Sequence, residues 1–474
     1  MKHRTFLFVI LLSSVAFSQT QTLTDFEIAE IYSETEANEN VFENIDIGIN
    51  TVYLNDVNSD FTSFEDLVWL KLISKENKVV LLGETHYSEN IGNLKNRIIF
   101  ALNTFDYFPL VIIEREYSST PFLNHFIQLT NKKEANTFFK DELGNMIKAK
   151  GDSIFIEHLR YWNQKNPHKK IELGCIDLEW TYGKMLEEIL KPYFYKLKEI
   201  DKDSIDKIIE LGKNQPNRFF LEIKPLLTEA KKQNLQGAYP FIDPQFIENV
   251  IDNFLATHNA LTDMDSFDYH RQKSLTNKIE NDKYFGKYYK NQKVIAYGGG
   301  EHMKSKFIYP NGENFLSEGS YLNYDFKFTK GKVFSIMLSG LSFSLGEMKD
   351  VDLHSCVGQG MQYNSILKRM QNAYKAKVLQ PDKNYFLFGQ RTDFEKFIIN
   401  KSYSNPTMGI IIPEKEWNKI SEYSSELNSE IRENIERENK ERRNFDTYIY
   451  IPYSPITKAR KTFGNNVYKK LPRQ

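Results

Sequence analysis

Four apolar runs along the chain end on ionisable side chains, and each has the length and composition of a β-strand. The runs, with the ionisable residues at their ends, are 79–82 with Glu84 and His86, 109–114 with Glu114, 170–177 with Asp177, and 293–302 with Glu301 and His302. Because the run 109–114 is almost wholly apolar, we expect a strand that is covered on both faces, as in a parallel sheet.

A helical pattern lies between the first two runs. Apolar residues recur there every three or four positions, at Ile91, Leu94, Ile98, Ile99, Leu102 and Phe105. Ser88 precedes them and is a suitable N-cap, since its side chain can accept a hydrogen bond from the first turn. The order strand–helix–strand, within one sheet, predicts parallel strands joined by a right-handed crossover.

The remaining pattern predicts many helices and a few more strands. Helices are expected at 64–73, at 121–166 and through most of 182–290, with breaks at Pro192, Pro216, Pro225 and the segment YPFIDP. Further strands are expected at 332–339, near YFLFG and MGIIIP, and at 446–452, and the charged stretch 426–443 predicts a solvated helix. The predicted class is α/β, with a mainly parallel central sheet flanked by helices, a largely helical insertion and an α+β C-terminal extension.

The first residues have the pattern of a secretory signal peptide. Lys2 and Arg4 precede an apolar run at 6–12 and small residues at 16–18. Cleavage there predicts a periplasmic or secreted protein, and no later stretch is apolar enough to predict a membrane span. The expected organisation is a signal peptide at 1–18, an N-terminal arm at 19–60, an α/β domain at 61–345 that includes the insertion at about 182–290, and an extension at 346–474 that completes or covers the core.

Composition narrows the range of partners and cofactors. The 474 residues include 62 basic and 63 acidic side chains, a net charge of −1, which argues against a nucleic-acid partner. Two cysteines, Cys175 and Cys356, are too few for a disulfide framework, so we expect both to be structural and Cys175 to be a buried thiol. The sequence has no metal-binding motif of the HExxH or clustered Cys/His kind, so no resident cofactor is expected.

The strand ends carry the candidate chemistry. The carboxyl ends of parallel strands meet at one edge of a sheet, where ligands bind. We therefore expect one cleft that holds His86 and His302 among carboxylates, which can raise the basicity of a histidine and fix its tautomer. The glycines before His302 either permit a close backbone approach or form a flexible turn. Lys95 lies on the apolar side of its helix and either reaches the cleft or extends to water. The residues expected to contact a substrate are Tyr87, Tyr117, Asp177 and Glu301.

These motifs resemble the erythromycin esterase-like family, part of a superfamily that also holds haem-binding ChaN-type and Tiki/TraB-type proteins. The segment LLGETH resembles the family's first strand end, Lys95 its basic residue nine positions after the histidine, and Glu114 the glutamate that closes its next strand. The segments LRYWNQKNPHKKIELGCIDLEW and VIAYGGGEHMKS, the second followed by EGSYLNYDF, resemble its tryptophan-containing helix and its later histidine strand. Gly299 stands where the family has the first of two histidines, and the resemblance covers about residues 65–345.

The resemblance implies an exported hydrolase that acts on a small-molecule ester or lactone. Carried over by position, His86 would be the general base that activates water, and Glu84 and Glu114 would orient it or the water. His302 would be a second acid/base, and Lys95 would contact the developing oxyanion.

The alternative is a haem- or metal-binding protein of the same superfamily without esterase activity. In that case His86, His302, Tyr87 or Tyr117 would be ligands. The sequence indicates no oligomeric state.

Overall fold

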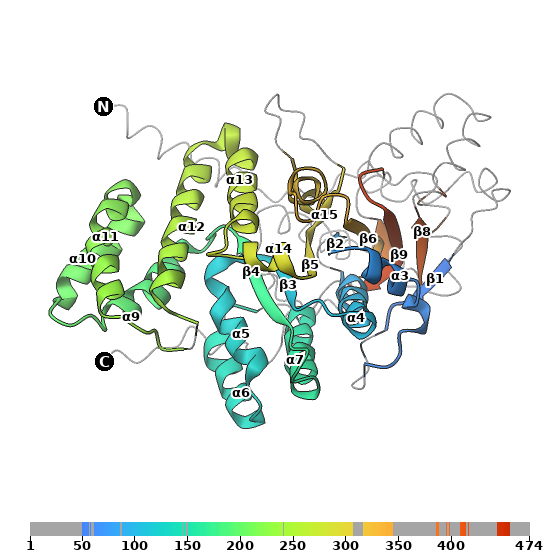
Figure 1. Ribbon diagram of the computed structural model, residues 1–474, viewed down its shortest axis with the longest axis horizontal. Helices are drawn as coiled ribbons and strands as arrows, with labels where there is room; N and C mark the ends of the chain where they lie inside the picture. The colour runs from blue at the N-terminus through green and yellow to red at the C-terminus, as the bar shows by residue number, and fades with distance from the viewer. Residues whose placement is uncertain are drawn as a thin grey trace, which may run out of the picture.

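The computed structural model describes residues 50–55, 57, 61–85, 88–144, 146–147, 150–239, 241–306, 316–344, 385–387, 395, 398, 408–413, 416 and 443–455. Within these residues nine strands form one sheet in the order β1-β8-β9-β6-β2-β5-β3-β4, with β7 paired to β6 (Figure 1). The strands are β1 (Asn50–Tyr53), β2 (Val79–Glu84), β3 (Leu110–Glu116), β4 (Glu172–Asp177), β5 (Val294–Gly299), β6 (Val333–Ser344), β7 (Tyr385–Leu387), β8 (Met408–Pro413) and β9 (Thr447–Pro455).

The centre of the sheet is parallel. β2 pairs with β5 and β6, and β3 pairs with β4 and β5, all in parallel register. β9 is also parallel to β6, whereas the pairs β1–β8, β8–β9 and β6–β7 are antiparallel. The predicted α/β class with a mainly parallel sheet is confirmed. The predicted strand–helix–strand unit gives two parallel strands, β2 and β3, but β5 lies between them.

Helices cover both faces of these apolar strands. α4 (Glu89–Phe105) follows β2 and begins after Ser88, whose Oγ accepts a hydrogen bond from the N–H of Ile91 at 3.1 Å, so the predicted N-cap is confirmed. In Figure 1, α4 and α7 (Lys150–Lys165) lie on one side of the sheet, and α13 (Phe267–Glu280) and α15 (Gly300–Met303) lie on the other. The centre of the sheet therefore lies between two helical layers.

The predicted insertion is a group of helices beyond β4. It contains α8 (Tyr182–Met185), α9 (Lys191–Phe194), α10 (Lys202–Asn214), α11 (Pro216–Lys232), α12 (Pro244–Thr262), α13 and α14 (Gly286–Asn291). Figure 1 shows α9 to α12 at the β4 end of the sheet, opposite β1 and β8. The break predicted at Pro225 is wrong, because Ile223 and Leu226 on either side of it are buried and hold α11 together. Pro216 begins this helix, where its missing N–H costs nothing.

The C-terminal strands are integral to the sheet. The strands predicted near YFLFG and MGIIIP and at 446–452 correspond to β7, β8 and β9. Cys175 is a buried free thiol, as predicted, and burial raises its pKa to about 12. No helix in the described ranges is long and apolar enough to cross a membrane. The predicted signal peptide, the arm before residue 50, Cys356 and the charged stretch at 426–442 lie outside the described residues.

A buried arginine attaches the chain before β2 to the core. The end of the predicted N-terminal arm forms β1 at the edge of the sheet. Arg97 on α4 donates to both carboxylate oxygens of Asp66 at 2.9 and 2.6 Å, and to the carbonyl oxygens of Tyr53 and Ser63 at 2.6 and 3.0 Å. Helical spacing alone places Arg97 away from the apolar stripe of α4, but the segment from β1 covers it and leaves 2% of the side chain exposed.

We predict that Arg97→Met destabilises the protein by about 3 kcal/mol, because Asp66, only 8% exposed, would remain as a buried charge without its partner. Urea unfolding measures the difference. Arg218→Met is the matched control, since the Arg218 side chain is 61% exposed in its pair with Glu222, and it should change stability by less than about 0.5 kcal/mol. Equal effects of the two variants would contradict the role assigned to Arg97.

Candidate active site

Three glycines bring the end of β5 against a carboxylate of β3. Gly298 and Gly299 end β5 and Gly300 begins α15, so the last positions of the predicted strand, including His302, are helical instead. A Cβ atom at Gly298 would lie 2.6 Å from Oε2 of Glu114. The Glu114 carboxylate occupies this space and accepts a hydrogen bond from the N–H of Gly299. The glycines therefore serve close approach, with the chain leaving the sheet at Gly299.

An arginine from the insertion joins the ends of β3 and β4. Nε and Nη2 of Arg271 donate to the two oxygens of Asp177 at 2.9 and 2.8 Å, and Nη2 also donates to Oε1 of Glu114 at 2.6 Å. Exposure is 16% for the Arg271 and Glu114 side chains and 6% for Asp177. Burial alone would lower the pKa of Arg271, but the two carboxylates raise it, so the guanidinium is charged. We call Glu114, Asp177 and Arg271 the arginine cluster.

His302 lies beside this cluster. Its Nε2 is 3.6 Å from Oε1 of Glu114, and its Nδ1 is buried without a hydrogen bond to any described residue. Burial, and then the positive charge of Arg271, lower the pKa of His302 below its ordinary 6.5, although Glu114 and Asp177 oppose this. The imidazole is therefore neutral at neutral pH and can accept a proton.

Two further ionisable side chains are buried next to the cluster. Glu318 begins α16 (Glu318–Ser320), is 1% exposed, and its Oε1 has no hydrogen-bond partner among the described residues. Burial, followed by repulsion from Glu114 and Asp177, raises the pKa of Glu318 to about 8. Lys278 on α13 donates to Oγ of Ser274 at 2.7 Å, and burial lowers its pKa to about 8. At neutral pH the carboxyl group of Glu318 is therefore mainly protonated.

A separate ion pair closes the end of β2. Nζ of Lys95 lies 2.7 Å from Oε2 of Glu84 and 4.0 Å from the centre of the Tyr297 ring. The Lys95 side chain is 7% exposed, so it turns inward to the strand end instead of extending to water.

This pair and the arginine cluster belong to opposite faces of the same sheet edge. Glu84 is in register with Gly299, and Leu82 is in register with Tyr297, so these positions share the face that Lys95 covers. Glu114 lies over Gly298, the neighbouring position of β5. Because successive residues of a strand point to opposite faces, β5 separates the two groups.

The other predicted site residues do not join the arginine cluster. Tyr117 follows β3 directly, but its ring stacks on Phe246 of α12 at 5.6 Å and its hydroxyl accepts from Nδ2 of Asn249 at 3.1 Å, so it packs into the insertion. The Glu301 side chain is 65% exposed and pairs with Lys304 at 2.7 Å. His86 and Tyr87 lie outside the described residues.

Sequence patterns missed the residues that the insertion and α16 contribute. Arg271 lies 94 positions after Asp177, and the sequence assigned no site residue to the helix that carries Arg271 and Lys278, or to the segment that carries Glu318. Arg271 and Lys278 lie three or four positions from Leu275 on α13, and this helical spacing is the signal that could have found them. Glu318 stands in a short polar segment without a periodic pattern, and the signal that could have found it is the likeness of EGSYLNYDF to a segment of the family.

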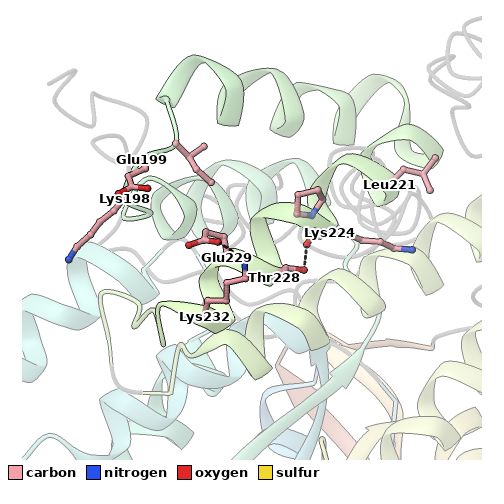
Figure 2. Close-up of a pocket in the computed structure, with 9 residues that line it drawn as sticks. Lys198, Glu199, Leu221, Lys224, Thr228, Glu229 and Lys232 are labelled. Atoms are coloured by element: carbon pink, nitrogen blue, oxygen red, sulfur yellow. Dashed lines mark hydrogen bonds and ion pairs between the residues drawn. The ribbon is translucent and has the colours of Figure 1, made fainter.

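No group of three or more His, Cys, Asp or Glu side chains in the described part of the chain is placed to hold a metal ion. Arg271 occupies the oxygens of Asp177 that a metal would need. Figure 2 shows a surface hollow along α11, whose lining includes Leu221, Lys224 and Lys232. None of the residues of the candidate site lines it, and Lys232 is paired there with Glu229, so this hollow is not the site.

The fold has been seen in solved structures. A succinoglycan biosynthesis protein is 12% identical and matches with a TM-score of 0.51 over 91% of this chain and 99% of its own. A protein from Bacillus cereus is 14% identical, with a TM-score of 0.51 over 92% and 99%. A variant of the erythromycin esterase EreC in its open conformation is 11% identical, with a TM-score of 0.48 over 86% and 98%. No family model and no curated protein matches the sequence. The likenesses to the succinoglycan biosynthesis protein and to the Bacillus cereus protein show a shared fold.

We predict that Glu318 makes stability fall as pH rises. Its pKa is about 8 in the folded chain and near 4.5 when unfolded, so unfolding releases a proton between these values. The contribution of the protonated Glu318 carboxyl group to the free energy of unfolding is complete below pH 4.5 and is lost as pH rises through 8. Glu318→Gln should therefore gain stability over the wild type between pH 5 and 7.5, by on the order of 2 kcal/mol in urea unfolding. Glu301→Gln, at an exposed position, should show no such gain, and a constant difference for Glu318→Gln would refute the assignment.

Proposed function

We propose that the protein is an exported hydrolase of ester or lactone bonds, in which a His/Glu cluster activates water. The observation that carries the proposal is the neutral His302 imidazole next to the Glu114 carboxylate, which Arg271 and the N–H of Gly299 hold in place. The resemblance of the strand-end motifs to erythromycin esterase-like proteins supports the choice of an ester bond.

The proton transfer uses the pair of His302 and Glu114. A neutral imidazole can take a proton from water or from an attacking group, and the adjacent carboxylate stabilises the imidazolium that results. The separation of 3.6 Å is longer than a hydrogen bond, as is common before a substrate binds. His86 is the general base that the family resemblance implies, and in the proposed mechanism it shares the acid/base work with His302.

Arg271 is a better oxyanion donor than Lys95. Nζ of Lys95 is committed to Glu84 on the other face of the sheet edge. Nη1 of Arg271 makes no hydrogen bond to the described residues, and part of this side chain remains exposed. A charged donor of fixed position beside the acid/base group can stabilise the negative charge that develops on a carbonyl oxygen. The mechanism as proposed uses no resident metal or haem.

One experiment tests the function and its alternative together. The purified protein is incubated with p-nitrophenyl esters and macrolides, with and without a chelator, and its absorption is scanned after haemin is added. Turnover that survives the chelator supports the hydrolase. A Soret shift without turnover would instead favour the haem-binding alternative.

We predict that His86→Ala and His302→Gln each lower kcat by at least about a hundredfold, the usual contribution of a positioned acid/base. Initial rates on the best ester of the panel measure the effect. His168→Gln is the matched control at an exposed position and should keep the wild-type rate. A folded His302→Gln variant with the wild-type rate would remove this residue from the mechanism.

We predict that kcat/KM falls on the acid side of the pH profile only below pH 6.5. The pKa of His302 is lowered from 6.5 by burial and by Arg271, so the imidazole loses its ability to accept a proton only in more acidic solution. Rates measured between pH 4.5 and 8 locate the acid limb of the pH profile, which is the range where kcat/KM falls with pH. Unfolding curves at each pH are the control. A limb centred above pH 6.5 would contradict the assignment.

A further inference from the structure

An exposed tryptophan is fixed at the edge of the arginine cluster. Trp180 follows β4 and is 39% exposed. Its Nε1 donates to Oδ2 of Asp177 at 2.8 Å, and the guanidinium carbon of Arg271 lies 5.4 Å from the centre of its ring. The ring of Phe267 lies at a tilt with its centre 5.7 Å away. The indole thus belongs to the same contact network as the charged groups of the site.

The backbone on both sides of Trp180 is also fixed. On one side, the N–H of Glu179 donates to Oγ1 of Thr257 at 2.9 Å. On the other, Thr181 donates through its N–H and its hydroxyl to the carboxylate of Glu116 at 2.6 and 2.8 Å. An aromatic ring held at both backbone neighbours and at its own N–H loses little entropy when a ligand packs on it.

We propose that Trp180 is a specificity-determining residue that contacts the substrate. Its exposed indole surface, extended by Phe267, receives a flat apolar group of the ester, while Nη1 of Arg271 faces the carbonyl oxygen. The inference rests on the proposed hydrolase function and names its substrate class, which is esters with an aromatic or similarly flat apolar group next to the scissile bond.

The contacts explain why this position differs from other exposed aromatic residues. Tyr161 on α7 is 42% exposed, and its ring contacts Lys165 of the same helix. Single exposed aromatic side chains of that kind are common and need no function. Trp180 instead contacts two members of the arginine cluster, Asp177 and Arg271. A substrate group that packs on its ring would therefore lie next to the atoms that react in the proposed mechanism.

The test compares two acetate esters, 2-naphthyl acetate and ethyl acetate, in the wild type and in Trp180→Ala. The loss of kcat/KM caused by the substitution is calculated for each ester, and the ratio of the two losses cancels their different intrinsic reactivity. We expect the loss to be about tenfold or more greater for the naphthyl ester, as removal of a stacking surface would give. Equal losses on the two esters would overturn the proposal.

Two variants separate contact with substrate from support of the cluster. Trp180→Phe keeps a ring but loses the N–H that binds Asp177, so it should retain most of the preference for the naphthyl ester. A preference lost completely in Trp180→Phe would show that the N–H, and not the ring surface, carries the effect. Tyr161→Ala is the control for removing an equally exposed aromatic side chain, and Trp180→Leu replaces Trp180→Ala if the alanine variant does not fold.

A binding measurement keeps this inference separate from the hydrolase function. Calorimetric titration with 2-naphthoate, whose carboxylate suits Arg271 and whose rings suit Trp180, should give an affinity that falls about tenfold in Trp180→Ala. If no ester is hydrolysed, the proposed function fails, and a Trp180-dependent affinity for naphthoate still supports the contact. Unchanged naphthoate binding in Trp180→Ala, or its absence in the wild type, would overturn it.

Discussion

The candidate site depends on one buried guanidinium that holds two carboxylates from different strands. Glu114 and Asp177 stand at the ends of neighbouring strands and would repel each other without a shared cation. Arg271 supplies that cation from a helix of the insertion, and its bidentate contact with Asp177 fixes the angle at which it meets Glu114. Removing charges from water is costly, so this arrangement is maintained only while all three groups are present. The insertion is thereby coupled to the sheet edge.

The charge balance of this region favours proton acceptance by a neutral histidine. Glu114, Asp177 and Arg271 together carry one net negative charge beside His302, which an imidazolium formed there would offset. Lys278, whose pKa is about 8, adds a positive charge next to this cluster at neutral pH. A third carboxylate would favour protonation of His302 before the reaction. Glu318 does not add that charge, because burial and its acidic neighbours raise its pKa to about 8 and keep it mainly protonated at neutral pH. At neutral pH Glu318 is thus protonated and His302 is not, which is the distribution that general base catalysis by His302 needs.

The sequence predicted the parts of the structure that depend on local patterns. Apolar runs located β2, β3, β4 and β5, and their last residues located Glu84, Glu114 and Asp177 at one sheet edge, because strand direction and alternation follow from spacing alone. Arg271 could not be found in this way, since its partners are distant in the chain and nothing in the pattern of α13 says which strand it meets. For the same reason the sequence placed Lys95 correctly on the inner side of α4 but could not choose between the cleft and water for its ammonium group.

Glu84 and Glu114 are separated because a single strand, β5, lies between the strands that carry them. β5 lies between β2 and β3, so residues that end those strands reach each other only across it. Successive residues of β5 face opposite sides of the sheet, so they place the two carboxylates on different faces. Gly299 lies on the face shared with Glu84, and Gly298 lies on the face shared with Glu114. Side chains at Gly298 would displace Glu114, and the glycine therefore sets the distance from which the carboxylate can serve His302. Under the proposed function, an ester carbonyl at Nη1 of Arg271 would approach from the Glu114 face, on the side of β5 away from the pair of Lys95 and Glu84.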